Sequence, residues 1–486
     1  MRLRALALVA TLLLAGCASV EPEPTLAPNS NPTDQDLVWV PCDDTFECAK
    51  IAAPIDWTSD TGEFLNIKLM RSVGTAELEP ILINPGGPGS SAVGWMRSNY
   101  DGIGSDWLRE NFQVIAFDPR GVGESTAVVC TDEELKDEVY YGISEFEFGS
   151  EEDIAYSEQA LAAFAASCQQ TGPNLGYFNT QQTARDMDLI RQLLGMDQLN
   201  YIGFSYGTEL GAVYTALFPD RVGKFVLDGA IDPTMDSSTS LLGQVTGFDK
   251  ALRAYLADCL NQAFCPFSGD VESAMAQISG FMQAREVKPL PTDGDRELGI
   301  SATLAGIIVT LYSQDSWVYL TQAFSDAFTG DGTLMLWLAD FYNDRDPDGG
   351  YVSNINEANY AINCADGAIQ EEGPDLEAEI LEASVVFGKY FAYPIDSCLG
   401  WPEGIGMQEL DFSQPLSNGP LVIGTTGDPA TPYEQAVTLS ELLDGAKLLT
   451  LRGEGHTAYG TSSCIDSLVD AYLEGTDLGE GSLSCF

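Results

Sequence analysis

The sequence is poor in histidine and in positive charge. His456 is the only histidine among 486 residues, and the chain has 22 Lys and Arg but 73 Asp and Glu, for a formal net charge of −51. A chain this acidic repels nucleic acid and anionic lipid headgroups, so we expect neither as a partner. Solubility and salt tolerance explain the acidity, and attraction of cationic peptides is the alternative.

The usual patterns of a metal site are also absent. The sequence contains no C-x-x-C, and a single histidine cannot complete a common zinc ligand set. The acidic loop DRDPDGG at 344–350 has aspartates at alternate positions, as a calcium loop does, but its twelfth position is Ile355 instead of Glu, and Pro347 interrupts it. We therefore expect a solvated acidic turn there, and neither a metal nor another cofactor.

Long apolar runs are confined to the N-terminus. MRLRALALVATLLLAGC combines two arginines, an apolar run too short to span a bilayer comfortably and small residues before Cys17, which predicts a signal peptide over residues 1–16. LAGC is similar to the lipobox of bacterial lipoproteins and implies lipidation of Cys17; an ordinary secretory peptide is the alternative. Residues 17–36 are rich in Pro and acidic residues, which predicts a disordered tether. We expect a protein anchored by lipid to the outer face of the cell membrane, or secreted.

Ten cysteines remain once Cys17 is set aside, an even number in a chain expected to reach an oxidising compartment. Five disulfides are therefore predicted. The sequence does not fix their connectivity, and our hypothesis is pairing of neighbours: Cys42 with Cys48, Cys130 with Cys168, Cys259 with Cys265, Cys364 with Cys398, and Cys464 with Cys485.

Short apolar runs recur between Gly, Pro and Asp residues, as expected for strands buried on both faces. Helical patterns lie between several of them, such as 183–195, where an apolar stripe ends at Gly195. The alternation predicts an α/β fold with a mostly parallel central sheet flanked by helices. The predicted strands are 81–84, 112–118, 200–204, 224–228, 421–424 and 447–451.

The alternation stops in the middle of the chain, where the pattern becomes helical and aromatic. We expect residues 233–400 to form a large helical cap inserted over the strand ends. The first part of the core would then comprise residues 37–232, and its C-terminal part residues 401–486. The sequence gives no prediction of the oligomeric state.

The stretch YIGFSYGTELG places Ser205 inside G-x-S-x-G, after a predicted strand and before a helical pattern. A sharp strand-to-helix turn would hold this serine in a strained conformation, and Gly203 and Gly207 would be needed where the two segments cross. The turn would present the hydroxyl above the sheet. It would also direct the Tyr206 N–H toward the oxygen of an incoming carbonyl group.

A serine hydroxyl is a weak nucleophile near pH 7 and needs a base, for which imidazole is suitable. His456 is the only candidate, and it follows a predicted strand in a glycine-flanked loop. In hydrolases with this kind of turn, an acid lies between serine and histidine in the chain. Asp428, in GDPATP, is our choice to orient the imidazole, and Asp228 at another strand end is the competitor.

The glycine-rich loop in LINPGGPGSS follows the strand at 81–84 and can bring backbone N–H groups close to a reacting oxygen. Gly87 is the predicted second oxyanion donor, because Pro85 and Pro88 have no N–H. A phosphate-binding loop is the rival interpretation. It fails because the P-loop Lys-Ser/Thr pair and a proper G-x-G-x-x-G are missing.

These motifs together resemble the α/β-hydrolase serine peptidases of the tripeptidyl aminopeptidase and proline iminopeptidase kind. The resemblance covers nearly the whole mature chain. It implies the α/β-hydrolase fold with a helical cap, exopeptidase activity on short peptides or free polypeptide N-termini through an acyl-enzyme, and no metal. The motifs are NPGGPG at 84–89, DPRGVGES at 118–125, GFSYGT at 203–208, SCLGWP at 397–402, GDPATP at 427–432 and GEGHT at 453–457.

The resemblance has limits. Pro85 stands where iminopeptidases usually have histidine, as in the tripeptidyl branch, which weakens a proline-specific assignment. Aminopeptidases of this type need a carboxylate for the substrate's ammonium group, and Asp366 in NCADG is the candidate, a solvated carboxylate being the alternative. The family includes esterase-like members, so a cell-surface serine esterase or lipase is the alternative function. A non-catalytic peptide-binding lipoprotein is a more remote one.

Overall fold

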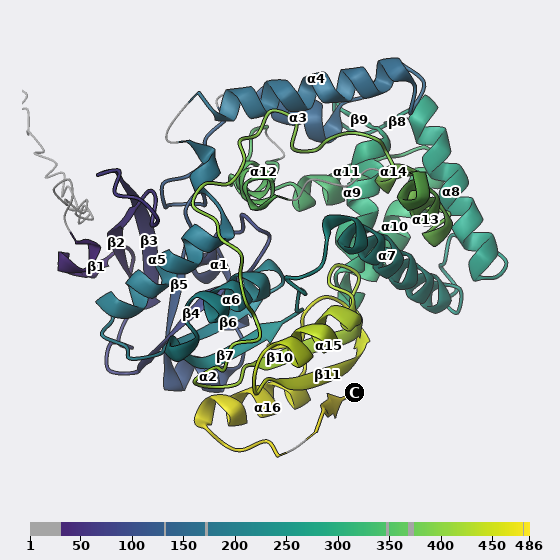
Figure 1. Ribbon diagram of the computed structural model, residues 1–486. Coiled ribbons are helices and arrows are strands. Elements are labelled where there is room, and N and C mark those ends of the chain that lie inside the picture. Colours follow the sequence, from purple (N-terminus) through teal and green to yellow (C-terminus); the bar gives the residue numbers. More distant parts are fainter. Residues whose placement is uncertain (1–30, 131–132, 171–173, 347–348, 368–373, 480) are drawn as a thin grey trace, which may run out of the picture.

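The computed structural model describes residues 31–130, 133–170, 174–346, 349–367, 374–479 and 481–486 (Figure 1). The predicted signal peptide and Cys17 lie outside these residues. A ten-stranded sheet runs through the described part of the chain, antiparallel at one edge and parallel from β5 onward. Its strands, in spatial order, are β1 (Val40–Pro41), β2 (Phe46–Pro54), β3 (Phe64–Ser72), β5 (Phe112–Phe117), β4 (Glu79–Asn84), β6 (Leu199–Phe204), β7 (Val222–Asp228), β10 (Leu421–Gly427), β11 (Lys447–Glu454) and β12 (Leu483–Cys485).

The apolar runs that predicted strands all fall in this sheet, and the prediction of a mostly parallel sheet is confirmed. Every residue of β5 and β6 is buried, because helices cover both faces of the sheet. Successive side chains point to opposite faces, so Leu82 belongs to one apolar cluster while its neighbours Ile81 and Ile83 belong to another. α1 (Ala92–Asn99), α2 (Asp106–Asn111) and α16 (Ser463–Glu474) pack on one face, and α5 (Thr180–Leu193), α6 (Tyr206–Leu217) and α15 (Tyr433–Leu442) on the other.

A separate helical body lies beside the sheet, with its own apolar cluster (Figure 1). Its elements all come between β7 and β10 in the sequence. They are α7 (Ser237–Cys259), α8 (Val271–Val287), the two-stranded ribbon β8 (Leu290–Pro291) and β9 (Glu297–Leu298), α9 (Ile300–Leu311), α10 (Trp317–Phe328), α11 (Thr333–Tyr342), α13 (Pro374–Ala383) and α14 (Gly388–Phe391).

α12 (Ile355–Asp366) leaves this body and packs on the sheet domain. Its residues Ala358 and Ile362 join the apolar cluster of the sheet, and the Asn359 side chain donates to the carbonyl of Pro88 at 3.0 Å. A Cβ on Gly89 would lie 2.4 Å from the Ile355 carbonyl oxygen, so the glycine is required at this approach. The glycine-rich loop at 84–89 is therefore held from the cap side.

Two helices that precede β6 also pack against the helical body. α3 (Glu133–Tyr141) contacts it through Asp137, which pairs with Arg345, and Tyr141, whose hydroxyl donates to the Ala339 carbonyl at 3.3 Å. α4 (Glu151–Cys168) lies across the top of the view in Figure 1, beside α3 and above α12. The expectation that 37–232 is wholly sheet core therefore misses a segment that contributes to the cap.

The end of the predicted tether is ordered, which corrects its C-terminal boundary. Residues Pro32–Asp34 form a short 3₁₀ helix. The Gln35 side chain then accepts from the Ala52 N–H and donates to the Ala52 carbonyl, both at 2.8 Å. The side-chain amide of Gln35 thus pairs with both backbone hydrogen-bonding groups of Ala52 in β2, and the chain is fixed from residue 32 onward.

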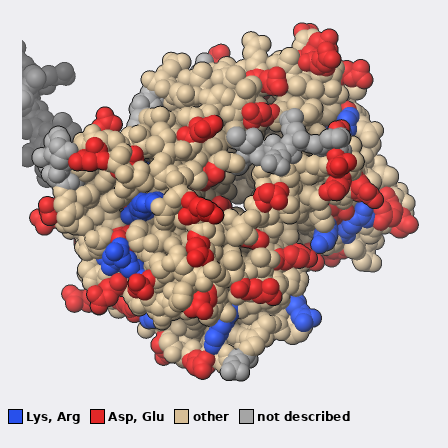
Figure 2. Space-filling model, viewed as in Figure 1, with Lys and Arg blue, Asp and Glu red and all other residues tan. Residues whose placement is uncertain are grey.

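The five disulfides are those of the neighbour hypothesis: Cys42 with Cys48, Cys130 with Cys168, Cys259 with Cys265, Cys364 with Cys398, and Cys464 with Cys485. None of the helices in the described residues has the length and apolar character needed to cross a bilayer. Acidic side chains are spread over the face shown in Figure 2, with few basic ones and a hollow near its middle.

Arg120, from DPRGVGES, is fully buried and holds several segments together. Its Nε and Nη2 donate to Asp186 at 2.8 and 2.7 Å, and its remaining hydrogens bond the carbonyls of Pro54, Ile55 and Tyr177. Both charged partners are essentially inaccessible to solvent. A buried ion pair with all its hydrogen bonds made is strongly destabilising to break.

Candidate active site

Ser205 occupies the turn between β6 and α6 and has φ 55° and ψ −126°, a conformation rare for a residue with a side chain. A Cβ on Gly203 would lie 2.2 Å from the Gly207 carbonyl oxygen, and one on Gly207 would lie 2.8 Å from the Asn84 carbonyl oxygen. Only glycine fits at these two positions, as the sequence predicted. The turn therefore presents the serine at the carboxyl edge of the sheet.

Asp428 and His456 come together across the ends of β10 and β11. Nδ1 of His456 lies 2.8 and 2.9 Å from the two carboxylate oxygens of Asp428. Asp428 is buried and also accepts the N–H groups of Ala430 and Thr431, while the Thr431 hydroxyl donates to it at 3.1 Å. These bonds hold the carboxylate against the imidazole, so that Nδ1 carries the proton and Nε2 is left without one.

Burial disfavours the charged imidazolium of His456, but the charge and hydrogen bond of Asp428 and the charge of Asp228 outweigh it. The pKa of His456 therefore lies above its ordinary value. The Tyr312 carbonyl accepts the His456 N–H at 2.9 Å, and the Tyr312 ring meets the imidazole edge to face at 5.4 Å. A residue of the cap thus helps to fix the histidine.

Asp228, the competing acid, does not bond the imidazole. Its Oδ2 accepts the N–H groups of Ala458 and Tyr459 at 2.9 and 2.7 Å, while Oδ1 is buried without a partner among the described residues. Burial raises the pKa of Asp228 to about 6, against the effect of those two hydrogen bonds. Asp228 therefore anchors the loop that follows His456.

Ser205 and His456 border the same strand end. The Ser205 N–H donates to the Asp228 carbonyl at 2.9 Å, and a Cβ on the next residue, Gly229, would lie 3.1 Å from Cε1 of His456. No hydrogen bond joins the Ser205 hydroxyl to the imidazole in the described part of the chain. Such bonds are often long without substrate and tighten in the complex.

The glycine-rich loop lies against the serine. A Cβ on Gly86 would lie 2.4 Å from the Phe204 carbonyl oxygen and 2.9 Å from Cβ of Ser205. The Gly86 N–H is occupied by the Asn84 side chain at 2.9 Å, whereas the N–H groups of Gly87 and Tyr206 have no acceptor among the described residues. Two free backbone donors beside a serine suit an oxyanion.

Asp366 ends α12 and bonds the first turn of α5. It accepts the Thr180 N–H at 2.8 Å and the Thr180 hydroxyl at 2.6 Å, and that hydroxyl lies 2.5 Å from the Tyr206 hydroxyl. Burial raises the pKa of Asp366 to about 7, although the bonds from Thr180 lower it. Asp366 is therefore tied to the serine-bearing helix, and it has a structural role in addition to any role in binding.

Sequence reasoning missed Glu209, which is four residues after Ser205 and therefore on the same side of α6. Its carboxyl group has no hydrogen bond or ion pair with any described residue. Burial, and then the charge of Asp366, raise the pKa of Glu209 to about 8. The spacing from Ser205 was the one signal that pointed to it.

Glu209 and Asp366 both line a cavity of about 760 Å³ between α6, the segment after β7 and α12. Neither forms a salt bridge with a lysine or arginine in the described residues. Across the part of the chain that the structure describes, no group of three or more His, Cys, Asp or Glu residues could hold a metal ion. Two carboxyl groups in one cavity, with no lysine or arginine paired to either, favour a cationic ligand.

Comparison with known proteins identifies the family. A family model described as the alpha/beta hydrolase fold matches residues 79–277, and one described as TAP-like protein matches 383–485. The fold and site thus define an α/β hydrolase. The serine protease Hip1 of Mycobacterium tuberculosis is 33% identical, with 99% of this chain and 96% of that protein aligned. The chain belongs to the α/β-hydrolase serine peptidases of the tripeptidyl aminopeptidase family.

Two further relatives carry different names. Carboxylesterase B of M. tuberculosis is 33% identical over 91% of this chain and 86% of its own length. Tripeptidyl aminopeptidase of Streptomyces lividans is 28% identical over 88% of this chain and 81% of its own length. The relatives therefore include names for both peptide and ester hydrolysis, and the family alone does not define the substrate.

Proposed function

We propose that the protein is a serine aminopeptidase that cleaves peptides from a free N-terminus. The observation that carries this proposal is the pair Glu209 and Asp366, without a basic partner in the described residues, in the cavity next to α6, the helix that Ser205 precedes. An ammonium group is the natural counter-charge for two carboxyl groups that have no basic partner. The relatives named serine protease and tripeptidyl aminopeptidase support the same substrate class.

In the proposed mechanism the Ser205 hydroxyl attacks the scissile carbonyl carbon while Nε2 of His456 takes its proton. Asp428 holds the imidazole in the required tautomer and stabilises the imidazolium that forms. The N–H groups of Tyr206 and Gly87 bind the oxyanion. His456 then protonates the leaving amine, which leaves an acyl group on Ser205, and a water molecule activated by the same imidazole releases the product.

The test compares three substrates: a peptide anilide with a free N-terminus, the same anilide acetylated, and a short acyl ester. We expect efficient cleavage of the free peptide and at least a tenfold lower kcat/KM for the acetylated one. In Glu209→Gln the KM for the free peptide should rise at least tenfold, while ester hydrolysis changes much less. Equal cleavage of free and acetylated peptides, with far faster ester hydrolysis, would identify an esterase instead.

We also propose that the mature chain is exported and carries lipid on Cys17. The N-terminal pattern and the five disulfides support an oxidising location outside the cytoplasm. Metabolic labelling with a fatty acid should label the wild-type chain and not Cys17→Ala. Labelling that persists in that variant would contradict the anchor.

A further inference from the structure

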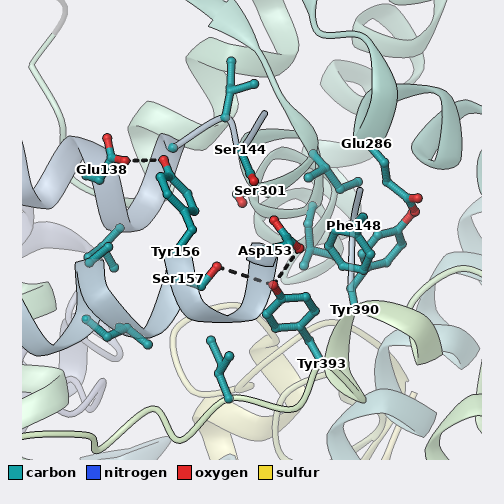
Figure 3. A pocket seen from close by; sticks show the side chains of 18 of the residues that line it. Glu138, Ser144, Phe148, Asp153, Tyr156, Ser157, Glu286, Ser301, Tyr390 and Tyr393 are labelled. Atoms are coloured by element: carbon teal, nitrogen blue, oxygen red, sulfur yellow. Dashed lines mark hydrogen bonds between the residues drawn. The ribbon is translucent and has the colours of Figure 1, made fainter. Parts of the chain in front are cut away.

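A second cavity, of about 360 Å³, lies where α3 and α4 meet α8, α9 and the segment around α14 (Figure 3). Its volume is within the range of small-molecule sites in proteins. It adjoins the cavity lined by Glu209 and Asp366, because Leu241, Tyr360 and Ser397 line both. The residues assigned to chemistry and to the substrate amine are not among those that line it.

Arg285, which lines this cavity, forms no ion pair with any described residue. The guanidinium nitrogens Nε and Nη1 of Arg285 are buried and have no hydrogen-bond partner among the described residues. The guanidinium lies 4.9 Å from the centre of the Phe281 ring, which supports the charge but accepts no hydrogen bond. Burial lowers the pKa of Arg285, but an arginine stays protonated in a protein. Unpaired donors of this kind are costly and favour an anionic ligand.

The acidic groups of the cavity are already bonded to other residues. Figure 3 shows the Tyr393 hydroxyl between Asp153 and Ser157, and it donates to Asp153 at 2.6 Å. In the same way the Tyr390 hydroxyl donates to Glu286 at 2.7 Å. Lys389 also pairs with Glu286. The third carboxylate, Glu138, accepts a hydrogen bond from the Tyr156 hydroxyl. Arg285 is not paired with any of these three carboxylates.

Two other features suit an amphipathic ligand. The rings of Phe148, Tyr390 and Tyr393 lie close together on one side of the cavity. The centre of the Phe148 ring is 4.9 Å from that of Tyr393 and 5.4 Å from that of Tyr390. The first turn of α9 also lines the cavity, at Ile300 and Ser301. The N-cap residue of this helix is Gly299, which has no side chain to accept a hydrogen bond from the backbone N–H groups of that turn. The aromatic wall would hold an apolar body, and the helix end adds partial positive charge to that of Arg285.

We propose that this cavity is a second ligand site, which binds a carboxylate carried on an aromatic or aliphatic body, with Arg285 pairing with the carboxylate. The carboxylate has two possible sources. It belongs either to the far end of a peptide whose amine lies in the neighbouring cavity, or to a separate organic acid. The site does not depend on the proposed aminopeptidase function; only its peptide source does.

The direct test is calorimetric binding of 3-phenylpropionate to the purified protein, with 3-phenylpropylamine as the probe of equal shape and opposite charge. We expect the acid to bind and the amine to bind at least tenfold more weakly. Arg285→Gln should weaken binding of the acid at least tenfold, and Arg285→Lys less. Arg253→Gln is the matched control, because it makes the same substitution at an arginine of the helical body that pairs with Asp249 and Glu272, none of which lines the cavity; it should change binding less than threefold.

Two results would overturn the proposal: preference for the amine, or unchanged binding of the acid to Arg285→Gln. The melting temperature provides a further check, because removing a guanidinium with two unpaired nitrogens should not lower it. A decrease of more than about 5 °C in Arg285→Gln would correspond to losing a structural interaction and would also contradict the proposal.

The source of the carboxylate is tested with peptides of four and five residues, each with a free or an amidated C-terminus. If the peptide provides the carboxylate, the free acid has the lower KM in the wild type, and the difference disappears in Arg285→Gln. If KM is the same for acid and amide while 3-phenylpropionate still binds, the source is a separate organic acid. Calorimetry requires no turnover, so failure of the peptidase proposal would not be mistaken for failure of this one.

Discussion

Two carboxylates lie at the ends of the neighbouring strands β7 and β10, and only one of them bonds the imidazole. Replacing Asp428 by asparagine would place an amide against Nδ1 of His456 and favour the tautomer with its proton on Nε2, facing the serine. We expect kcat to fall by roughly 10⁴-fold, or about 5.4 kcal/mol of transition-state stabilisation. The backbone bonds from Ala430 and Thr431 can still be accepted by the asparagine oxygen, so the fold should be kept.

Asp228→Asn is the matched comparison. The asparagine oxygen can replace Oδ2 and accept both the Ala458 and the Tyr459 N–H, and its amide would take the place of the unpartnered Oδ1. We expect kcat to change by less than about tenfold, because the imidazole keeps its partner.

The assay is steady-state hydrolysis of a free peptide anilide, with the fraction of active sites measured by titration and the melting temperature recorded for each variant. If Asp228→Asn lost as much activity as Asp428→Asn, Asp428 would not be the acid that orients His456. The same conclusion would follow if Asp428→Asn kept more than about a tenth of the wild-type kcat at an unchanged melting temperature.

Three further predictions follow from the geometry. Because the pKa of His456 is raised and the base must be neutral, the acidic limb of kcat/KM should have its midpoint above about 6.5, and Asp428→Asn should move it to lower pH, as a pH profile would show. Burial raises the pKa of Glu209 to about 8 and that of Asp366 to about 7, so both carboxyl groups gain charge between pH 6 and about 7.5, where a peptide amine is still largely protonated. The KM for free-amine peptides should therefore fall over this range while that for esters stays flat; parallel profiles would contradict this. Arg120→Met leaves Asp186 buried without its cation and should lower the free energy of unfolding by about 3–5 kcal/mol in urea titrations; a loss below about 1 kcal/mol would show that the pair is not structural.

The central strands could be predicted from the sequence because they are buried on both faces and appear as continuous apolar runs. The edge strands β2 and β3 could not, because charged residues such as Lys50, Lys68 and Arg71 interrupt their pattern. The even cysteine count predicted five disulfides, and the hypothesis of neighbour pairing matches them, with partners at most 38 residues apart, although the sequence alone left the connectivity open.

The site was predictable where chemistry restricts the residue type. Ser205 is constrained by the two glycines of its turn, and His456 has no competitor in the chain. Glu209 was not predictable as a site residue, because its exposure to the cavity depends on α12, which crosses from the cap onto the sheet domain. The second cavity depends on α3 and α4 packing against helices that come more than 100 residues later, a contact that no local pattern indicates.

Covalent labelling with a fluorophosphonate, followed by mass spectrometry of the labelled peptide, is the most direct test of Ser205 as the nucleophile. We expect one label per chain, located on Ser205, absent from Ser205→Ala and formed much more slowly in His456→Gln. A wild-type protein that resists the probe, or a Ser205→Ala variant that is still labelled stoichiometrically, would contradict this role of Ser205.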